Sequence, residues 1–316
     1  MDVLSQVIAT VRFSSSAFLD ARVSAPWCMT SQITPDDCQP YGEIPRHIVA
    51  YHYVVAGELF LSLPETDPIP LRSGDIVLLP KNDRHTLGSA VGLTPEYVDD
   101  AIHPPSDNKP ARLVIEGDGS SCHIICGFLG SDLAENPLLT SLPPLLTLDT
   151  NARSYGQWFG DSFVRAAEEF SVGGMGSNIV LSKLAELLFV EAIRQYMAQM
   201  SDTQTGWLAG LSDPKVGKAL TLMHNDPAYS WTAEELAHTV GASRSAFADR
   251  FTHFVGLPPM RYLAQWRLQL AALRLRETAH GIGKIALEVG YESETAFSRA
   301  FKKTFSTSPG HWRKAQ

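Results

Sequence analysis

Residues 285–297 have the sequence IALEVGYESETAF, and residues 236–247 have the sequence LAHTVGASRSAF. In both stretches an apolar segment leads to a glycine, then to a polar segment and a phenylalanine. The offset between them is 49 residues up to the glycine and 50 from the phenylalanine onward. Two short helices that meet at a glycine, the second beginning at a serine, are typical of a helix-turn-helix. The duplication predicts a protein that contacts DNA through two such motifs.

Capping signals fix the ends of the predicted helices. Thr232 and Glu235 have the spacing of a capping box, so a helix begins there and ends near Val240. Gly241 supplies the positive φ angle of the turn, and Ser243 caps the second helix of the first motif. In the second motif, Ser293 begins the corresponding helix.

A single helix is predicted between the motifs, from Pro259 to about Thr278. About 20 residues at a rise of ~1.5 Å each span ~30 Å. Successive major-groove faces of B-DNA are ~34 Å apart. The spacing therefore allows both second helices to lie on one face of a duplex.

The second helix of each motif should expose polar side chains to base edges, with Phe247, Phe251, Phe297 and Phe301 on its buried side. Lys302, Lys303 and Lys284 are expected at phosphates, which position a protein without specifying sequence. The full set of predicted DNA-binding residues is Arg244, Ser245, Asp249, Arg250, Ser293, Glu294, Thr295, Ser298, Arg299, Lys302 and Lys303.

The pattern GYxSxxxFxRxFKxxFxxxPxxWR, from Gly290 to Arg313, resembles the signature of the AraC/XylS family of bacterial transcription regulators. The resemblance covers about 100 residues. It implies a bipartite helix-turn-helix domain that activates, or sometimes represses, transcription, with RNA polymerase as a partner of an activator. It also implies an N-terminal cupin-like domain that binds an effector or dimerises. Among the predicted DNA-binding residues it places Arg244, Ser245, Ser293, Glu294, Thr295 and Arg299 on the base side.

The charge is divided unevenly along the chain. The formal net charge is -8, but from Asp213 to the end there are 14 Lys and Arg against 9 Asp and Glu, which gives +5 and leaves -13 for the remainder. A basic domain attracts phosphates, whereas an acidic domain is repelled by them. The C-terminal part is therefore the part expected on DNA.

The N-terminal part reads as an all-β domain, because short β-branched and aromatic runs alternate with Gly and Pro turns. Two helices are predicted next, at residues 154–170 and 177–200; the second is apolar over more than one face, which fits a lid on the barrel or a dimerisation helix. The predicted fold is an α+β multidomain protein: a cupin-like β-barrel, a helical dimerisation segment and an all-α double helix-turn-helix. Their predicted boundaries are 1–150 for the cupin-like domain, 151–200 for the dimerisation segment, 201–212 for a linker and 213–316 for the DNA-binding domain.

Gly74-x5-Pro80-x-Asn82-x2-His85 resembles the second cupin motif, with Asn82 where glycine is usual; asparagine tolerates the same left-handed turn. The first cupin motif is not reproduced, which disfavours an enzymatic cupin. His52, His85 and Cys126, completed by Cys28 or Cys122, could form a tetrahedral Zn²⁺ site. The alternatives are isolated core cysteines with a hydrogen-bonded histidine, and a redox-sensing thiol pair.

These features predict a sequence-specific transcriptional regulator, modulated by an effector or a metal through its cupin domain, and not an enzyme. Its expected partners are double-stranded promoter DNA, a small-molecule effector and a second copy of itself. With no secretory signal and no membrane span, it is expected in the cytoplasm. Two alternatives remain: a metal-dependent cupin enzyme fused to a DNA-binding module, and a regulator whose barrel only holds the dimer together.

Overall fold

The computed structural model describes residues 2–11, 13–39, 44–105, 109–131, 136–149, 154–201 and 204–314 of the 316-residue chain. Its contacts divide into two compact units. The barrel unit contains Arg12–Glu135 and Leu142–Gln199, and the helical unit contains Met1–Val11, Asn136–Ser141 and Met200–Gln316. Among the described helices, none combines the length and apolar character needed to cross a bilayer.

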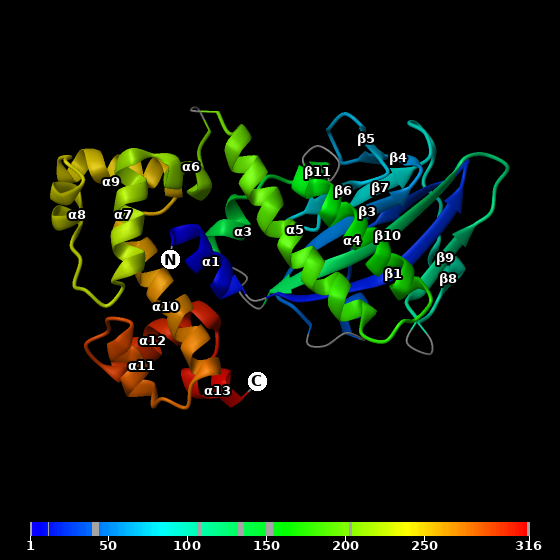
Figure 1. The fold of residues 1–316 in the computed structure, drawn as a ribbon. Helices are drawn as coiled ribbons and strands as arrows, with labels where there is room; N and C mark the ends of the chain where they lie inside the picture. The colour runs from blue at the N-terminus through cyan, green and yellow to red at the C-terminus, as the bar shows by residue number, and fades with distance from the viewer. Residues whose placement is uncertain are drawn as a thin grey trace. The chain divides into compact units, whose positions relative to one another are not determined.

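The barrel unit is built from two sheets (Figure 1). The strands are β1 (Ser14–Ser24), β2 (Cys28–Ser31), β3 (His47–Ala56), β4 (Glu58–Ser62), β5 (Ile69–Arg72), β6 (Asp75–Leu79), β7 (His85–Gly88), β8 (Ile102–His103), β9 (Ala111–Ile115), β10 (Ser121–Ser131) and β11 (Leu146–Asp149). The larger sheet has the order β11-β6-β3-β10-β1-β9-β8, and the smaller has the order β2-β7-β4-β5. The loops between the strands contain two short helices, α2 (Pro35–Cys38) and the 3-10 helix η2 (Asp99–Ala101).

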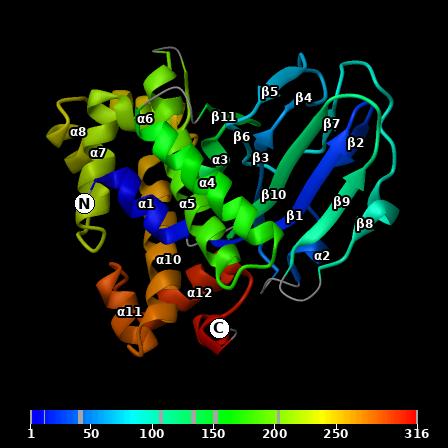
Figure 2. The same ribbon diagram turned by 45° about the vertical axis from the view of Figure 1, so that its right-hand side comes forward.

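Alternation along the strands separates an inner face from an outer face. On β10, for example, Ile124, Cys126 and Phe128 belong to the apolar cluster between the sheets, while Ile125 faces the other way. The outer face of the large sheet carries α4 (Ser154–Ser171) and α5 (Ser177–Gln199), which extend along it in two views (Figures 1 and 2). The predicted helices at 154–170 and 177–200 are thus confirmed almost to the residue.

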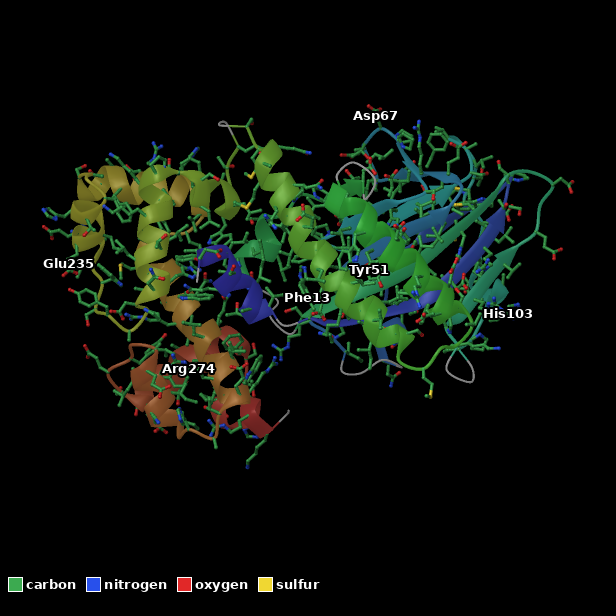
Figure 3. The ribbon with its side chains drawn as sticks, viewed as in Figure 1. Phe13, Tyr51, Asp67, His103, Glu235 and Arg274 are labelled. Atoms are coloured by element: carbon green, nitrogen blue, oxygen red, sulfur yellow. The ribbon has the colours of Figure 1, made fainter. Side chains whose placement is uncertain are left out.

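Aromatic contacts fix α4 on the sheet. Tyr51 and Tyr53 of β3 project from the outer face and meet Phe163 of α4, with ring centroids 6.4 and 4.5 Å apart (Figure 3 labels Tyr51). Phe13 meets Phe189 of α5 edge-on at 4.8 Å. Burial of such large rings is the main source of stability for this layer.

The turn before β7 has the conformation expected from the cupin-like motif. Asn82 has φ = 51°, in the left-handed region. Its side-chain amide donates to the Ile33 carbonyl at 2.7 Å, and its Oδ1 accepts from the Ile33 backbone N–H at 3.1 Å. These bonds tie the turn to the segment after β2 and aim His85 between the sheets.

The helical unit contains α1 (Val3–Val11), α3 (Pro137–Ser141), α6 (Trp207–Ser212), α7 (Pro214–Asn225), α8 (Ala233–Thr239), α9 (Arg244–Val255), α10 (Pro259–Glu277), α11 (Ile282–Glu288), α12 (Glu294–Phe305) and α13 (Pro309–Lys314). The two predicted helix-turn-helix motifs are α8–α9 and α11–α12, and α10 is the predicted helix between them. The capping box of Thr232 and Glu235 is present. Gly241 has the predicted positive φ, 68°.

Three helices of this unit lie outside the predicted DNA-binding domain at 213–316. Helices α1 and α3 come from the part of the sequence that reads as strands, and both group with the helical unit. Helix α1 packs on α7 and α10, and α3 packs on α6. Helix α6 occupies half of the predicted linker at 201–212, and its Trp207 is buried. The apolar residues of these short segments find partners only in the tertiary fold, which local sequence patterns do not show.

The two motifs differ at the residue that ends the second helix of each. Helix α9 ends at Gly256 with φ = 77°, and the equivalent residue at the end of α12 is Ser306 with φ = 59°. A left-handed serine is strained relative to glycine by about 1 kcal/mol. We expect Ser306→Gly to raise the free energy of unfolding by roughly that amount in thermal or denaturant unfolding. Thr304→Gly, inside α12, is the matched control and should lower it by roughly 0.3 kcal/mol; a loss in both variants would contradict the assignment.

Candidate functional site

Polar side chains gather at the exposed starts of α9 and α12. Arg244, Ser245 and Asp249 of α9 are exposed. On or beside α12 the exposed residues are Ser293, Glu294, Thr295, Arg299, Lys302 and Lys303, and Ser298 is half-buried. Ser243 and Ser293 cap the two helices, because their hydroxyls accept the backbone N–H of Ala246 and Ala296. An exposed, capped helix start is the part of a helix-turn-helix that enters the major groove.

The opposite side of each recognition helix is held by aromatic side chains. Phe247 and Phe251 of α9 are buried, and Phe251 contacts Tyr262 of α10 at 5.7 Å. At the equivalent place in the second motif, Phe301 of α12 contacts Trp312 of α13 at 5.8 Å. The repeated aromatic contact fixes which face of each helix remains exposed.

Arg250 differs from the other predicted DNA-binding residues. Its guanidinium forms a bidentate ion pair with Asp213, which is buried and also caps α7 by accepting from the N–H groups of Lys215 and Val216. Burial of Asp213 opposes its ionisation, but the hydrogen bonds from Arg250 and the two backbone groups lower its pKa overall. The structure therefore gives Arg250 a supporting role, holding α9 against α7.

Three lysines of the helical unit also form contacts within the fold. Lys218 donates to the Thr239 carbonyl at 2.7 Å and Lys215 donates to the Gly241 carbonyl at 3.1 Å, so both stabilise the end of α8. Lys284, predicted at a phosphate, lies 3.1 Å from His280 and 3.9 Å from the carboxylate of Glu288. The contacts of Lys215 and Lys218 could not be read from the sequence, because their partners lie on another element. Lys284 and Glu288, in contrast, are four residues apart on the same helix.

Helix α10 sets the distance between the two motifs. Its 19 residues span about 28 Å at ~1.5 Å each. That length is about 6 Å short of the ~34 Å between successive major-groove faces. The helical unit thus has two recognition helices and a connecting helix close to the length needed for one face of B-DNA.

A second set of predicted residues meets between the sheets of the barrel unit. His52 lies directly opposite Cys126 in the β3–β10 register, and its Nδ1 is 3.1 Å from the Cys126 Sγ. Its Nε2 is 2.8 Å from the Nε2 of His85, which reaches across from β7. His85 Nδ1 is 2.8 Å from the Asp83 carbonyl oxygen. The histidines therefore link the two sheets through an otherwise apolar interior.

Only one arrangement of protons satisfies this row of hydrogen bonds if all its groups are neutral. Since a carbonyl only accepts, His85 donates from Nδ1 and accepts at Nε2, His52 donates from Nε2, and Cys126 donates its S–H to His52 Nδ1. Burial favours the neutral forms: it lowers the pKa of His52 and His85 and raises that of Cys126 to about 12.

This geometry does not fit one tetrahedral zinc ion bound by all three side chains. Cys126 and His85 lie at different ring nitrogens of His52, and those nitrogens point away from each other. The facing Nε2 atoms are also closer than the about 3.3 Å that separates two nitrogens on tetrahedral Zn²⁺. Across the described residues, no group of three or more His, Cys, Asp or Glu is arranged to hold a metal ion.

The remaining cysteines lie apart from this cluster. Cys28 lies on β2 opposite Gly88, and Cys122 is four residues along β10 from Cys126. All four cysteines are buried free thiols. Burial raises the pKa of Cys122 to about 11, so the reactive thiolate is disfavoured and the redox-sensing alternative gains no support.

Sequence reasoning missed one group of charged residues on the outer face of the large sheet. Asp20 and Arg22 alternate on β1, and His123 of β10 donates to Asp20 at 2.8 Å. Charged residues at alternate positions of an otherwise apolar strand were a signal for this group. Its partner on a distant strand could not be deduced from that signal.

A double helix-turn-helix with exposed recognition helices, joined to a cupin-like barrel, defines a DNA-binding regulator with a sensor-type domain. Comparison with known proteins agrees with this class. Residues 2–198 match a family model described as cupin, and residues 236–315 match one described as helix-turn-helix domain. The chain belongs to the AraC-like family of transcription regulators.

Its relatives share both parts of the chain. An AraC-like transcription regulator of Streptomyces antibioticus is 35% identical over 84% of this chain and 87% of its own length. The transcriptional regulator AlkR of Acinetobacter baylyi is 30% identical over 99% of both chains. The RCS-specific transcriptional activator RclR of Escherichia coli is 29% identical over 87% of both. The protein is therefore a DNA-binding transcription regulator with a cupin-type domain.

Proposed function

We propose that this regulator binds two successive major-groove segments of its operator through α9 and α12, as a homodimer whose activity is set by an effector at the barrel unit. The observation that carries the proposal is the pair of exposed, serine-capped helix starts joined by the about 28 Å of α10. The same architecture supports a role in regulation and not in catalysis. Since its target is chromosomal DNA, the compartment proposed is the bacterial cytoplasm.

In vitro selection of DNA sites with the full-length protein, followed by footprinting, tests the proposal. Two protected segments about one helical turn apart are expected for each bound chain. Protection of one segment, or binding without sequence preference, would contradict the two-motif mode. Activation through contact with RNA polymerase is proposed because RclR is described as an activator; transcription in vitro from the selected site tests it, and repression there would contradict it.

Helix α5 is the proposed dimerisation surface. One side of it is buried through Leu181, Leu184 and Leu188. Another side exposes Ile179, Val180 and Leu187, with exposed fractions of 68%, 48% and 53%. The predicted second apolar face is therefore present, and a partner helix of a second copy would cover it.

Leu187→Glu is expected to weaken dimerisation at least about tenfold, because a buried leucine contributes about 1.5 kcal/mol or more and an unpaired charge would be buried instead. Sedimentation equilibrium measures the change. Arg165→Glu, on an exposed position of α4, is the matched control. A monomeric wild-type protein, or equal dimer affinity in both variants, would contradict the proposed surface.

Zinc binding remains a prediction, with His52 and His85 as its ligands from the predicted set. Of the five predicted ligands, His52 and His85 direct nitrogens at one point, so an ion there would have to separate them and complete its shell with other donors. Elemental analysis of protein prepared without chelators or a metal-affinity tag checks it. About one zinc per chain, lost in His85→Ala, is the expected result; metal-free protein would remove both the zinc site and the metal-dependent enzyme alternative.

A further inference from the structure

A cavity of about 690 Å³ lies at the edge of the large sheet where β1, β9 and β10 approach their ends. Its walls include Arg22 and His123, with Ala56 and Val114 beside them and Glu116 and Asp118 on the following turn. The interior between the sheets, in contrast, is filled by apolar side chains. The volume lies within the roughly 300 to 1,000 Å³ of small-molecule sites.

A buried hydrogen bond holds His123, one of the residues that line this cavity. The Asp20 side chain is buried, and its Oδ1 accepts from His123 Nε2 at 2.8 Å. Burial raises the pKa of Asp20, but the hydrogen bonds from His123 and Ser171 outweigh it, so its pKa is lowered overall. A buried carboxylate is costly to retain unless it is paired, and this one holds His123 of the cavity wall in place.

Arg22 and His123 both line the cavity, and Arg22 supplies the donors for an anionic group. With Nε2 committed to Asp20, Nδ1 is the remaining nitrogen of His123, a residue that lines the cavity. Arg22 is the register partner of His123, is half-exposed, and approaches Asp20 with Nε at 3.5 Å. That contact leaves most of its five N–H donors for another acceptor, and the planar fork of arginine fits a carboxylate.

Acidic residues lie near Arg22 in the wall of the cavity. Val114 is the register partner of Arg22 on β9, and Glu116 follows it by two residues. Strand geometry then separates Arg22 and Glu116 by about 8 Å between Cα atoms. Val114, 46% exposed although apolar, lies between the cationic and the acidic sides. A ligand with two negative charges would be repelled by Glu116 and Asp118.

We propose that this cavity binds a small zwitterion of the α-amino-acid class. The carboxylate lies against Arg22, the ammonium group faces Glu116 and Asp118, and the side chain packs on Val114. The regulatory meaning of such binding rests on the proposed function, in which the barrel unit receives an effector. Binding itself can be measured without DNA.

Thermal unfolding of the full-length protein with each of the twenty standard amino acids, followed by calorimetric titration of those that raise the melting temperature, tests the proposal. If valine is such a ligand, isovalerate, which lacks its ammonium group, and isobutylamine, which lacks its carboxylate, should bind at least about tenfold more weakly. Arg22→Ala and Glu116→Gln should each weaken amino-acid binding by a similar factor. Arg165→Ala, on the exposed surface of α4, should leave it unchanged.

No response to any of the twenty amino acids would overturn the proposal, as would equal affinity in Arg22→Ala and wild type. Equal binding of the amino acid and of its carboxylate analogue would overturn the zwitterion assignment. Operator binding, measured separately without amino acids, distinguishes these results from a failure of the proposed regulatory function, because the recognition helices belong to the other unit.

Discussion

Arg299→Ala is expected to weaken binding to the specific operator about 10- to 100-fold, while the helical unit stays folded. Arg299 is exposed on α12, one turn beyond the capped start of the helix, whereas the neighbouring Phe297 and Phe301 are buried. A bidentate contact from arginine to a guanine contributes about 1–3 kcal/mol of discrimination. Gel-shift titration with the selected operator and with a scrambled duplex, at one salt concentration, measures the loss.

Lys303→Ala is the matched control for Arg299→Ala, because Lys303 is exposed near the end of the same helix. A phosphate contact there predicts a similar loss on both duplexes and a salt dependence reduced by about one unit. Arg299→Ala should instead reduce the preference for the operator. If it binds the operator as tightly as the wild type does, its assignment to a base is wrong.

The helical unit is expected to lose stability as the pH falls below about 6.5, and His224 is the residue responsible. Its Nε2 accepts from the Tyr262 hydroxyl at 2.7 Å, and that hydroxyl accepts from Trp207 Nε1 at 2.8 Å. The imidazole also stacks on Trp266, with ring centroids 4.1 Å apart. Burial in this aromatic cluster lowers the pKa of His224 to about 3.

The direction of the effect follows from proton binding. Between pH 6.5 and pH 3 the unfolded chain binds a proton at His224 and the folded chain does not, so lowering the pH favours unfolding. Each pH unit in this window costs about 1.4 kcal/mol, which gives about 2 kcal/mol between pH 6.5 and 5. Above pH 6.5 the histidine is neutral in both states and contributes no pH dependence.

Chemical denaturation of the wild type and of His224→Gln at a series of pH values isolates this contribution. The variant lacks the titrating group, so its free energy of unfolding should change less between pH 6.5 and 5, whatever its absolute stability. Burial also lowers the pKa of His52 and His85 in the barrel unit, and both proteins share that response. Equal slopes in the two proteins would contradict the role of His224.

Much of the fold could be predicted because its signals are local. Capping residues, the positive-φ glycine and the apolar spacing placed α8, α10 and the starts of α9 and α12 within one or two residues, and the turn at Asn82 followed from the residue tolerances of a left-handed turn. The same reasoning brought His52, His85 and Cys126 together correctly. It could not find which ring nitrogen faces which partner, and that detail decides against a single three-ligand zinc ion.

The features that escaped prediction depend on distant partners. Arg250 looks like any exposed arginine of a recognition helix until Asp213 is placed beside it. Asp20 and its partner His123, which lines the cavity, are 103 positions apart in sequence. Helices α1 and α3 are too short to be distinguished from loops or strands by periodicity, and tertiary packing determines them.

The discontinuity of the helical unit has a consequence for synthesis on the ribosome. Gln6 of α1 pairs with Asn225 of α7 across 219 residues. Translation at about 5–20 residues per second places roughly 10–40 s between the synthesis of α1 and that of its partner. During this time the valine side of α1 is exposed while the barrel unit is synthesised. The barrel can fold as it leaves the ribosome, but the DNA-binding unit is completed only near the end of translation. A nascent or truncated chain therefore carries the cupin-type domain before it can engage a promoter.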